Sequence, residues 1–539
     1  MKKYLKKALY IVAAVGIIGF SSCNDFEEMN NNPSKSTTTD PNSQLTYAQL
    51  YAYGDVELVE TNTVYYSAFV QHLQGEWNTT NYGGQYRKYN SQFEKTWNRA
   101  YANPLKNIAD ILANTEDKEL YVNVRSLARI FRVYYSMLLT DMHGDIPYTE
   151  AGKGYIEGIV KPKYDTQEFI YQDFLKELKE AGDALSAEGG SITGDVIYNG
   201  SIDKWKRFAN SLRLRLAMRL VKVSSETAKA EVEDILSSAA GVFKSTADNP
   251  IIEYQNYFDW DVTEFRRNGI SQFWRGREPY PSTYICSTLW DMLKDRNDPR
   301  LFIIGRAYDE SSPNDPFNRV DLTEEMMEEA GIDKFQAVKP GFFWWDNWPS
   351  GYWSNLTNKW QDKACRPQVN NAFLKGETPG IIISYAEVEL LLAEANVRWS
   401  LTDAVSAEQH YTNGVAAAMN ILVNYDKDFI ISSDKITAYL STNPFPSTAN
   451  DKIKAVNEQL WILHFNNSPE AFSNWRRTGY PQLKASGEYG AQTIDSQTIP
   501  RRLPYPITEA SYNKEEYNRV VQELGGTDTW NGRVWWDKQ

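Results

Sequence analysis

The chain of 539 residues carries a formal net charge of −13 at pH 7. This acidic balance argues against nucleic-acid binding, because phosphates attract basic surfaces. Hydrophobic residues make up 42% of the chain and charged residues 24%, as in ordinary folded globular proteins. Aromatic residues are frequent, at 14%, and the mean hydropathy is −0.55. We therefore expect many of the rings to lie at or near the surface.

The N-terminus has the parts of a secretory signal peptide. Four lysines lie within the first seven residues, Ala8 to Phe20 form an apolar run without charge, and Ser21-Ser22-Cys23 follows. The run is too short to span a membrane as a helix, which takes about 20 residues, and the pattern is typical of an export signal. Small residues directly before Cys23 resemble a bacterial lipobox, in which the cysteine is acylated. We expect residues 1–22 to be removed and Cys23 to carry lipid; an ordinary signal peptide that ends near a cysteine is the alternative.

The residues after Cys23 predict a flexible tether. Residues 24–44 are poor in aliphatic side chains and rich in Asn, Ser, Thr and Pro, so they cannot bury enough apolar surface to order themselves. We therefore divide the chain into a signal peptide (1–22), a lipid-anchored tether (23–44) and a single folded domain (45–539). Cys286 and Cys365 are the other two cysteines, and whether they pair is left open.

From residue 45 onward the pattern is mostly helical. Apolar residues recur at helical spacing in four long stretches. One ends near Asp141, before a Gly-Pro turn; Asp203 is a candidate N-cap of another, and Ser384 with Glu387 matches a capping box. The four apolar stripes run over residues 127–138, 170–185, 205–220 and 385–399. Paired helices with short polar breaks suggest helical hairpins of the tetratricopeptide kind, although no strict 34-residue period is visible.

Long segments without helical or alternating periodicity lie between these helices. Such long irregular segments are uncommon unless they carry function or are disordered. They are residues 77–89, 249–281, 309–362 and 480–513. Their aromatic content argues against disorder.

Several distinctive motifs are spread over nearly the whole chain. They are LTDMHGDIPY from Leu139, IDKWKRFANSLRLR from Ile202, DPRL from Asp298, SYAE from Ser384 with AEA from Ala393, WRRTGYP from Trp475 and IPRRLPYP from Ile499. Together, and in this order, they resemble the motifs of the SusD/RagB-like outer-membrane lipoproteins of the Bacteroidetes. Asp25, Glu27 and Glu28 also resemble the acidic export tag that follows the lipid cysteine in surface lipoproteins of that group.

The resemblance implies both a fold and a role. It implies a mainly α-helical domain with a tetratricopeptide-like scaffold and long loops. It also implies a lipid-anchored protein, exposed on the outer membrane, that captures nutrient for a SusC-like TonB-dependent transporter. We interpret the charged motif residues as structural ion pairs, because charges among apolar stripes need partners. They are Arg213, Arg215, Arg476, Arg477, Arg501 and Arg502, with Asp141, Asp145 and Glu387.

Ligand contact is instead expected from aromatic residues in the irregular segments. Sugars present C–H faces that pack on rings and hydroxyls that need hydrogen-bonding partners. Burial of roughly 50–100 Å² per ring gives on the order of 1–2.5 kcal/mol, and binding itself costs several, so two or three rings are required. The alternative for any single ring is that it fills a gap between a loop and the scaffold. The candidate residues are Trp77, Tyr82, Tyr86, Trp274, Arg277, Trp344, Trp345, Asn347, Trp348, Tyr352 and Trp353.

Catalytic and metal sites find little support in the sequence. The four histidines are isolated from one another, and no H-E-x-x-H, G-x-S-x-G or Walker A motif occurs. His143 between Asp141 and Asp145 suggests hydrogen bonding at a turn more than a metal site. No cofactor is expected; calcium at Asp259 and Asp261 is an alternative without an EF-hand pattern.

Three hypotheses follow for the function. The preferred one is a glycan-binding lipoprotein of a nutrient importer, without enzymatic activity. The second is the same role with an oligopeptide ligand, and the third, more remote, is a surface glycoside hydrolase.

Overall fold

The computed structural model describes residues 39–258, 264–276, 284–308, 321, 323, 325, 334–343, 346, 352–354, 359–361, 364–402, 404–494 and 497–539. For residue 334 and for those between 351 and 365 it describes the backbone only. Within these ranges the fold is mainly α-helical, as expected. No helix in the described part of the chain is both long enough and apolar enough to cross a membrane.

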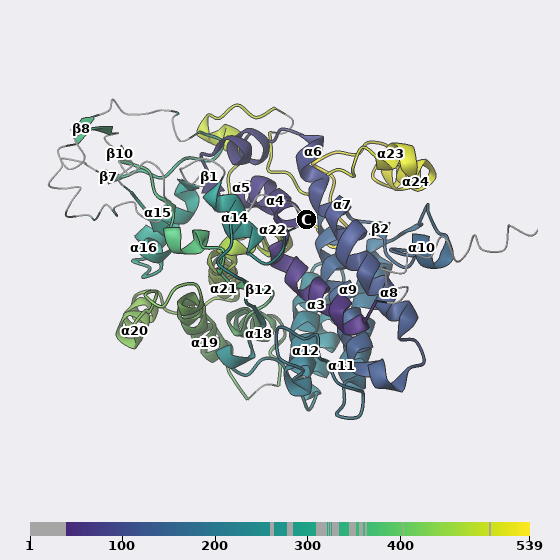
Figure 1. The fold of residues 1–539 in the computed structure, drawn as a ribbon. Helices are drawn as coiled ribbons and strands as arrows, with labels where there is room; N and C mark the ends of the chain where they lie inside the picture. The colour runs from purple at the N-terminus through teal and green to yellow at the C-terminus, as the bar shows by residue number, and fades with distance from the viewer. Residues whose placement is uncertain are drawn as a thin grey trace, which may run out of the picture.

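Helices of the first half form the larger part of the scaffold (Figure 1). The α-helices are α3 (Pro41–Gly54), α4 (Val56–Thr61), α5 (Ser67–Phe69), α6 (Asn90–Phe93), α7 (Lys95–Ala100), α8 (Lys106–Asn114), α9 (Val122–His143), α10 (Gly154–Glu157), α11 (Gln167–Ala184), α12 (Ile202–Arg219) and α13 (Ser225–Ser237). Three π-helical turns, η1 (Asn62–Tyr66), η2 (Thr79–Gly84) and η3 (Tyr101–Leu105), interrupt the series. Consecutive long helices pack pairwise: α8 on α9, α9 on α11, α11 on α12 and α12 on α13.

Most helices of the second half build a second group beside the first in Figure 1, whereas the last two, α23 (Glu509–Tyr512) and α24 (Lys514–Glu523), lie next to the first group instead. The others are α14 (Gly269–Arg275), α15 (Ser287–Asp295), α16 (Leu301–Ile304), α18 (Tyr385–Trp399), α19 (Ala407–Asn420), α20 (Ser433–Thr442), α21 (Ala449–Leu463) and α22 (Ser468–Thr478). Helix α18 packs on α19, on α21 and on α12. It therefore joins the two groups.

The strands are short. The largest sheet has the order β1 (Leu73–Gln74), β5 (Tyr284–Ile285), β11 (Gln368–Val369) and β6 (Gly305–Arg306), all antiparallel. The two-stranded pairs are β2 (Ile146–Pro147) with β3 (Tyr164–Asp165), β4 (Ile251–Ile252) with β12 (Gly380–Ile381), β7 (Lys334–Phe335) with β10 (Ala364–Cys365) and β8 (Tyr352–Ser354) with β9 (Lys359–Gln361). They hold loops together, and Leu73, Ile285 and Val369 of the largest sheet are buried in the main hydrophobic core.

Four details of the expected elements need correction. The folded part begins before residue 45, because Asp40 caps α3 by accepting a hydrogen bond from Ser43 N (3.1 Å), with Pro41 at the first helical position. Ser201, not Asp203, is the N-cap residue of α12. None of the four segments expected to be irregular is wholly so. Segment 77–89 contains η2, 249–281 contains β4 and α14, 309–362 contains β7, β8 and β9, and 480–513 contains η10 (Ser486–Tyr489) and α23.

The fourth detail concerns the capping box of α18. Ser384 does cap this helix, since its hydroxyl accepts from Glu387 N (3.2 Å). The Glu387 carboxylate does not accept a hydrogen bond from the backbone N–H of Ser384, which a capping box requires. It pairs with Arg215 (2.6 Å) and with His464 (3.1 Å) instead.

Ion pairs fasten the loops and helices, as the sequence predicted for most of the charged motif residues. Asp141 pairs with Arg219 (3.3 Å). Asp145 differs from the prediction: it accepts a hydrogen bond from Gln167 N (2.8 Å) and has no ion pair within the described ranges. Five of the six motif arginines have a carboxylate partner: Arg213 with Asp234 and Glu231, Arg215 with Glu387, Arg477 with Glu394, Arg501 with Asp537 and Arg502 with Asp528. Arg476 has no ion pair within the described ranges; it donates to Arg501 O (3.0 Å) and stacks on Phe472. His143 lies 3.1 Å from Leu503 O through Nδ1, as expected of a hydrogen-bonding turn.

Candidate ligand-binding site

The candidate site is built on the chain that leaves β1 and turns through η2. Gly75 adopts φ +97°, which favours glycine, and forms a parallel β-bridge with Phe343. Gly83 lies so close to η1 that an added Cβ would stand 2.2 Å from Val64 O. These close contacts hold the turn against the scaffold, and π-helical turns such as η2 are frequent at functional sites.

The first ring surface is formed by Trp77 and Phe343. Their ring centroids are 5.3 Å apart with an interplanar angle of 23°, a stacked arrangement. Trp77 is 54% exposed. Because Phe343 supports one face of the indole, the arrangement leaves much of a large, oriented ring open to solvent.

The second ring surface is formed by Tyr82 and Tyr89. These rings are nearly parallel, with centroids 4.6 Å apart and an angle of 2°. Tyr89 is 45% exposed, and its backbone N–H donates to the hydroxyl of Tyr65 (3.1 Å). Tyr65 is buried, so the pair rests on the core.

Hydrogen bonds join η2 to the segment that carries Phe343. Thr80 Oγ1 accepts from Gly75 N (2.9 Å) and donates to Phe342 O (3.1 Å). Gln85 Nε2 donates to Gly341 O (3.2 Å). The two segments that supply the first ring surface are therefore fixed relative to each other.

A carboxyl group lies directly beside the first ring surface. Glu76 precedes Trp77 and accepts a hydrogen bond from Thr79 N (2.9 Å). Loss of hydration raises the pKa of Glu76 from 4.5 to about 7. Near neutral pH this side chain therefore exists in both protonation states.

The structure places two predicted contact residues inside the protein. Tyr86 is 1% exposed and accepts from Ser486 N through its hydroxyl (2.9 Å); Trp274, on α14, is 2% exposed and packs against Phe465. A buried ring has no face open to a sugar. The expectation for these two residues is corrected: they anchor loops to the scaffold, the alternative that the sequence left open.

Other predicted residues lie outside the described part. These are Cys23, Arg277, Trp344, Trp345, Asn347 and Trp348, and also Asp259 and Asp261 of the calcium alternative. Tyr352 and Trp353 form part of β8, whose backbone pairs with β9. Phe343 was not among the predicted contacts, although its place in the aromatic run from Gly341 to Trp353 is a signal that points to it.

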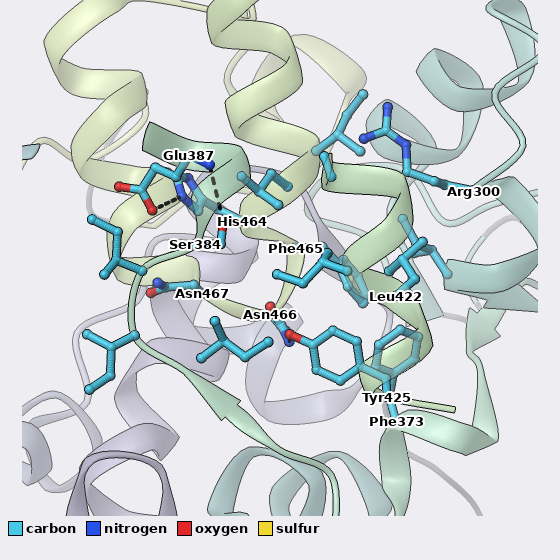
Figure 2. A pocket seen from close by; sticks show the side chains of 18 residues that line it. Arg300, Phe373, Ser384, Glu387, Leu422, Tyr425, His464, Phe465, Asn466 and Asn467 are labelled. Atoms are coloured by element: carbon cyan, nitrogen blue, oxygen red, sulfur yellow. Dashed lines mark hydrogen bonds and ion pairs between the residues drawn. The ribbon is translucent and has the colours of Figure 1, made fainter. Parts of the chain in front are cut away.

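A separate cavity lies between α18, η8 (Ile421–Asn424) and η9 (His464–Asn466) (Figure 2). Its wall is mostly apolar, with a hydrogen bond from Asn466 Nδ2 to the hydroxyl of Tyr425 (2.7 Å). Its volume of about 40 Å³ suits about three water molecules, at roughly 10–15 Å³ each. It is too small for a sugar ring, and we do not assign the ligand to it.

Comparison with known proteins identifies the family. Residues 31–506 match the model of a SusD-like family described as starch-binding and associating with the outer membrane. A SusD-like structure from Bacteroidetes, AC2a, shares 36% identity over 93% of this chain and 100% of its own, with a TM-score of 0.86. A structure named a chitin-binding protein shares 35% identity over the same proportions, with a TM-score of 0.77.

A SusD homologue from Bacteroides fragilis has the same fold at 22% identity, with a TM-score of 0.71 over 93% of this chain and all of its own. No curated protein sequence matches. The chain therefore belongs to the SusD-like family of outer-membrane-associated, nutrient-binding proteins.

Proposed function

We propose that this protein captures oligosaccharides at the cell surface and passes them to a SusC-like TonB-dependent transporter, without cleaving them. The observation that supports this proposal most is the exposed Trp77 ring, stacked on Phe343. Supported rings bind the C–H face of a sugar without first losing side-chain freedom. The second ring surface, Tyr82 and Tyr89, adds contact area on the same turn of the chain.

The first ligands to test are oligomers of N-acetylglucosamine. The relative named a chitin-binding protein shares 35% identity across nearly the whole chain, and the family description names starch. Isothermal titration should include both chitin and starch oligosaccharides. Chromatography of the same samples should show no shortened product, whereas turnover would identify a glycoside hydrolase instead.

The oligopeptide alternative is tested on ligand from the native host. A peptide site relies more on backbone hydrogen bonds than on stacked rings. Mass spectrometry of small molecules that co-purify with the protein should detect sugars. Peptides alone would contradict the glycan proposal while leaving the nutrient-binding role in place.

We further propose that acyl chains on Cys23 hold the mature protein on the outer membrane, facing outward. Growth of the host with labelled palmitate should label the wild-type chain and leave Cys23→Ala unlabelled. Affinity purification from solubilised membranes should recover a TonB-dependent transporter with the wild-type protein. A mature chain that is free in the periplasm would contradict this part of the proposal.

A further inference from the structure

The second ring surface carries positive charge at its edge. Arg87 and Lys88 directly precede Tyr89, and all three side chains are exposed. The residue before them, Tyr86, adopts φ +55° and is 1% exposed, so its buried ring anchors the turn from which they project. The stacked pair of Tyr82 and Tyr89 is therefore adjoined by a guanidinium and an ammonium group that solvent reaches.

Of these two cations, Arg87 is the one that a ligand can use. Lys88 Nζ donates to the backbone oxygen of Asp528 at 3.5 Å. Arg87 forms no ion pair with any residue that the structure describes. Its backbone is fixed instead, because Arg87 N donates to Tyr82 O (2.8 Å) and Arg87 O accepts from the hydroxyl of Tyr65 (3.3 Å). The guanidinium thus stands on a well-held stretch of chain, beside the ring pair.

Negative charge acts less strongly on this surface than positive charge does. The pKa of Tyr82 is raised chiefly by burial, and the charge of Arg87 opposes the rise. Glu76 also acts on Tyr82, with a smaller effect than Arg87. The carboxylate of Asp528 is already paired with Arg502. Although the chain as a whole is acidic, at −13, charges farther away than about 8 Å are largely screened at physiological ionic strength. The ring pair therefore favours an anion.

We propose that the second ring surface binds a uronic acid residue of the oligosaccharide, that is, a sugar whose ring carries a carboxylate. The C–H face of this sugar packs on Tyr89, whose ring is supported by Tyr82. The carboxylate accepts hydrogen bonds from Arg87, because a guanidinium presents paired N–H donors that match its two oxygens. The inference rests on the proposed function and specifies one unit of the ligand. The first ring surface takes another unit, which need not be charged.

The test uses the full chain with Cys23→Ala, which removes the proposed lipid-attachment site and the need for detergent. One probe is a hyaluronan hexasaccharide, which alternates N-acetylglucosamine with glucuronate; the other is an oligogalacturonate, with a different linkage. Each is titrated calorimetrically beside its own methyl ester, which has the same sugars without the charge. At least one acid should bind roughly tenfold more tightly than its ester, because hydrogen bonds to charged groups are the stronger ones. Raising the salt to about 1 M should remove most of this preference.

Substitutions at Arg87 test the guanidinium itself. Arg87→Gln removes the charge and leaves the backbone hydrogen bonds of this residue in place. It should abolish the preference for the acid while leaving the affinity for the ester nearly unchanged. Arg87→Lys keeps the charge without the paired donors and should retain part of the preference. Lys176→Gln is the matched charge control, because this side chain is 64% exposed on α11, which carries neither ring surface; here the preference should remain.

The outcomes separate this inference from the proposed function. Tighter binding of an acid than of its ester, lost in Arg87→Gln, supports both. Equal binding of acid and ester, or a preference that Arg87→Gln retains, overturns the uronate assignment and leaves oligosaccharide capture in place. The assignment is also overturned if neither acid binds while neutral chitin or starch oligomers do. If no oligosaccharide of any kind binds, the proposed function is overturned together with it.

Discussion

Trp77 lies on the surface, with its ring resting on Phe343. Because the ring is 54% exposed, Trp77→Ala should leave the free energy of unfolding nearly unchanged. It should weaken glycan binding by roughly 5- to 70-fold, which corresponds to the loss of about 1–2.5 kcal/mol of ring burial. Titration calorimetry and denaturant unfolding on the same preparation measure the two quantities.

Tyr512→Ala is the control for Trp77→Ala. Tyr512 is 74% exposed on α23 and belongs to neither ring surface. Its removal should change neither glycan affinity nor stability. Equal losses of affinity in the two variants would show that surface aromatics act nonspecifically.

The raised pKa of Glu76 predicts that the stability of the protein depends on pH. Burial raises its pKa from 4.5 to about 7, so the folded protein holds this proton more tightly than the unfolded chain does. The stabilisation that protonated Glu76 contributes is complete below about pH 4.5. It is lost as the pH rises through about 7, and the free energy of unfolding falls by about 3 kcal/mol in total. Glu76→Gln, which cannot ionise, should therefore be more stable than the wild type at pH 8 and similar to it at pH 4.5.

Denaturant unfolding at both pH values measures this difference. Glu119→Gln, at an exposed position, controls for the loss of one negative charge. If Glu76→Gln shifts stability equally at the two pH values, the carboxyl group does not titrate as described.

At the scale of elements, the contact between η1 and η2 positions the ring surfaces. Gly83→Ala would place a methyl group 2.2 Å from Val64 O, so η2 must move away from η1. Overpacking of this kind costs about 1–3 kcal/mol of stability. Glycan affinity should fall as well, because Tyr82 and the turn after Trp77 belong to η2 or adjoin it.

Gly154→Ala is the matched control for this substitution. An added Cβ there meets no atom closer than 3.4 Å. Stability and glycan binding of this variant should stay near those of the wild type. Unchanged binding in Gly83→Ala would separate η2 from the ligand site.

Removal of the buried ion pair between α18 and α22 should cause a large loss of stability. Glu394 is fully buried, accepts from Arg477 at 2.7 Å, and its pKa is lowered to about 2 chiefly by the Arg477 charge, against the opposing effect of burial. Glu394→Ala leaves that guanidinium uncompensated, which should cost about 3–5 kcal/mol. Glu233→Ala, which removes an exposed partner of Lys229, should cost under about 1 kcal/mol. Similar losses from the two variants, measured by denaturant unfolding, would refute the structural role of the buried pair.

Long helices were predictable from the sequence because their apolar stripes are periodic. The stripe ending near Asp141 became α9, and the one starting after Ser384 became α18. Cap details were less predictable, since Glu387 finds Arg215 and His464 across the fold rather than its own helix start. Short elements such as η2 and β1 depend on tertiary contacts, and no local sequence pattern predicts them.

At the scale of the whole molecule, a helical frame joined by buried ion pairs carries irregular segments that display rings. The sequence predicted the frame and suggested aromatic residues of the irregular segments as candidate contacts. It could not separate the exposed Trp77 from the buried Tyr86 and Trp274, because a ring in an aperiodic segment has no pattern that reveals which side it faces. That distinction requires the packing of segments distant in the chain.

The most direct measurement is calorimetric titration of chitin and starch oligosaccharides into the purified protein and into a Trp77→Ala/Phe343→Ala double variant. The account predicts binding of at least one oligosaccharide by the wild type, no product, and a large loss of affinity in the folded double variant. If no oligosaccharide of either series binds, or if the double variant binds as tightly as the wild type, the account is contradicted.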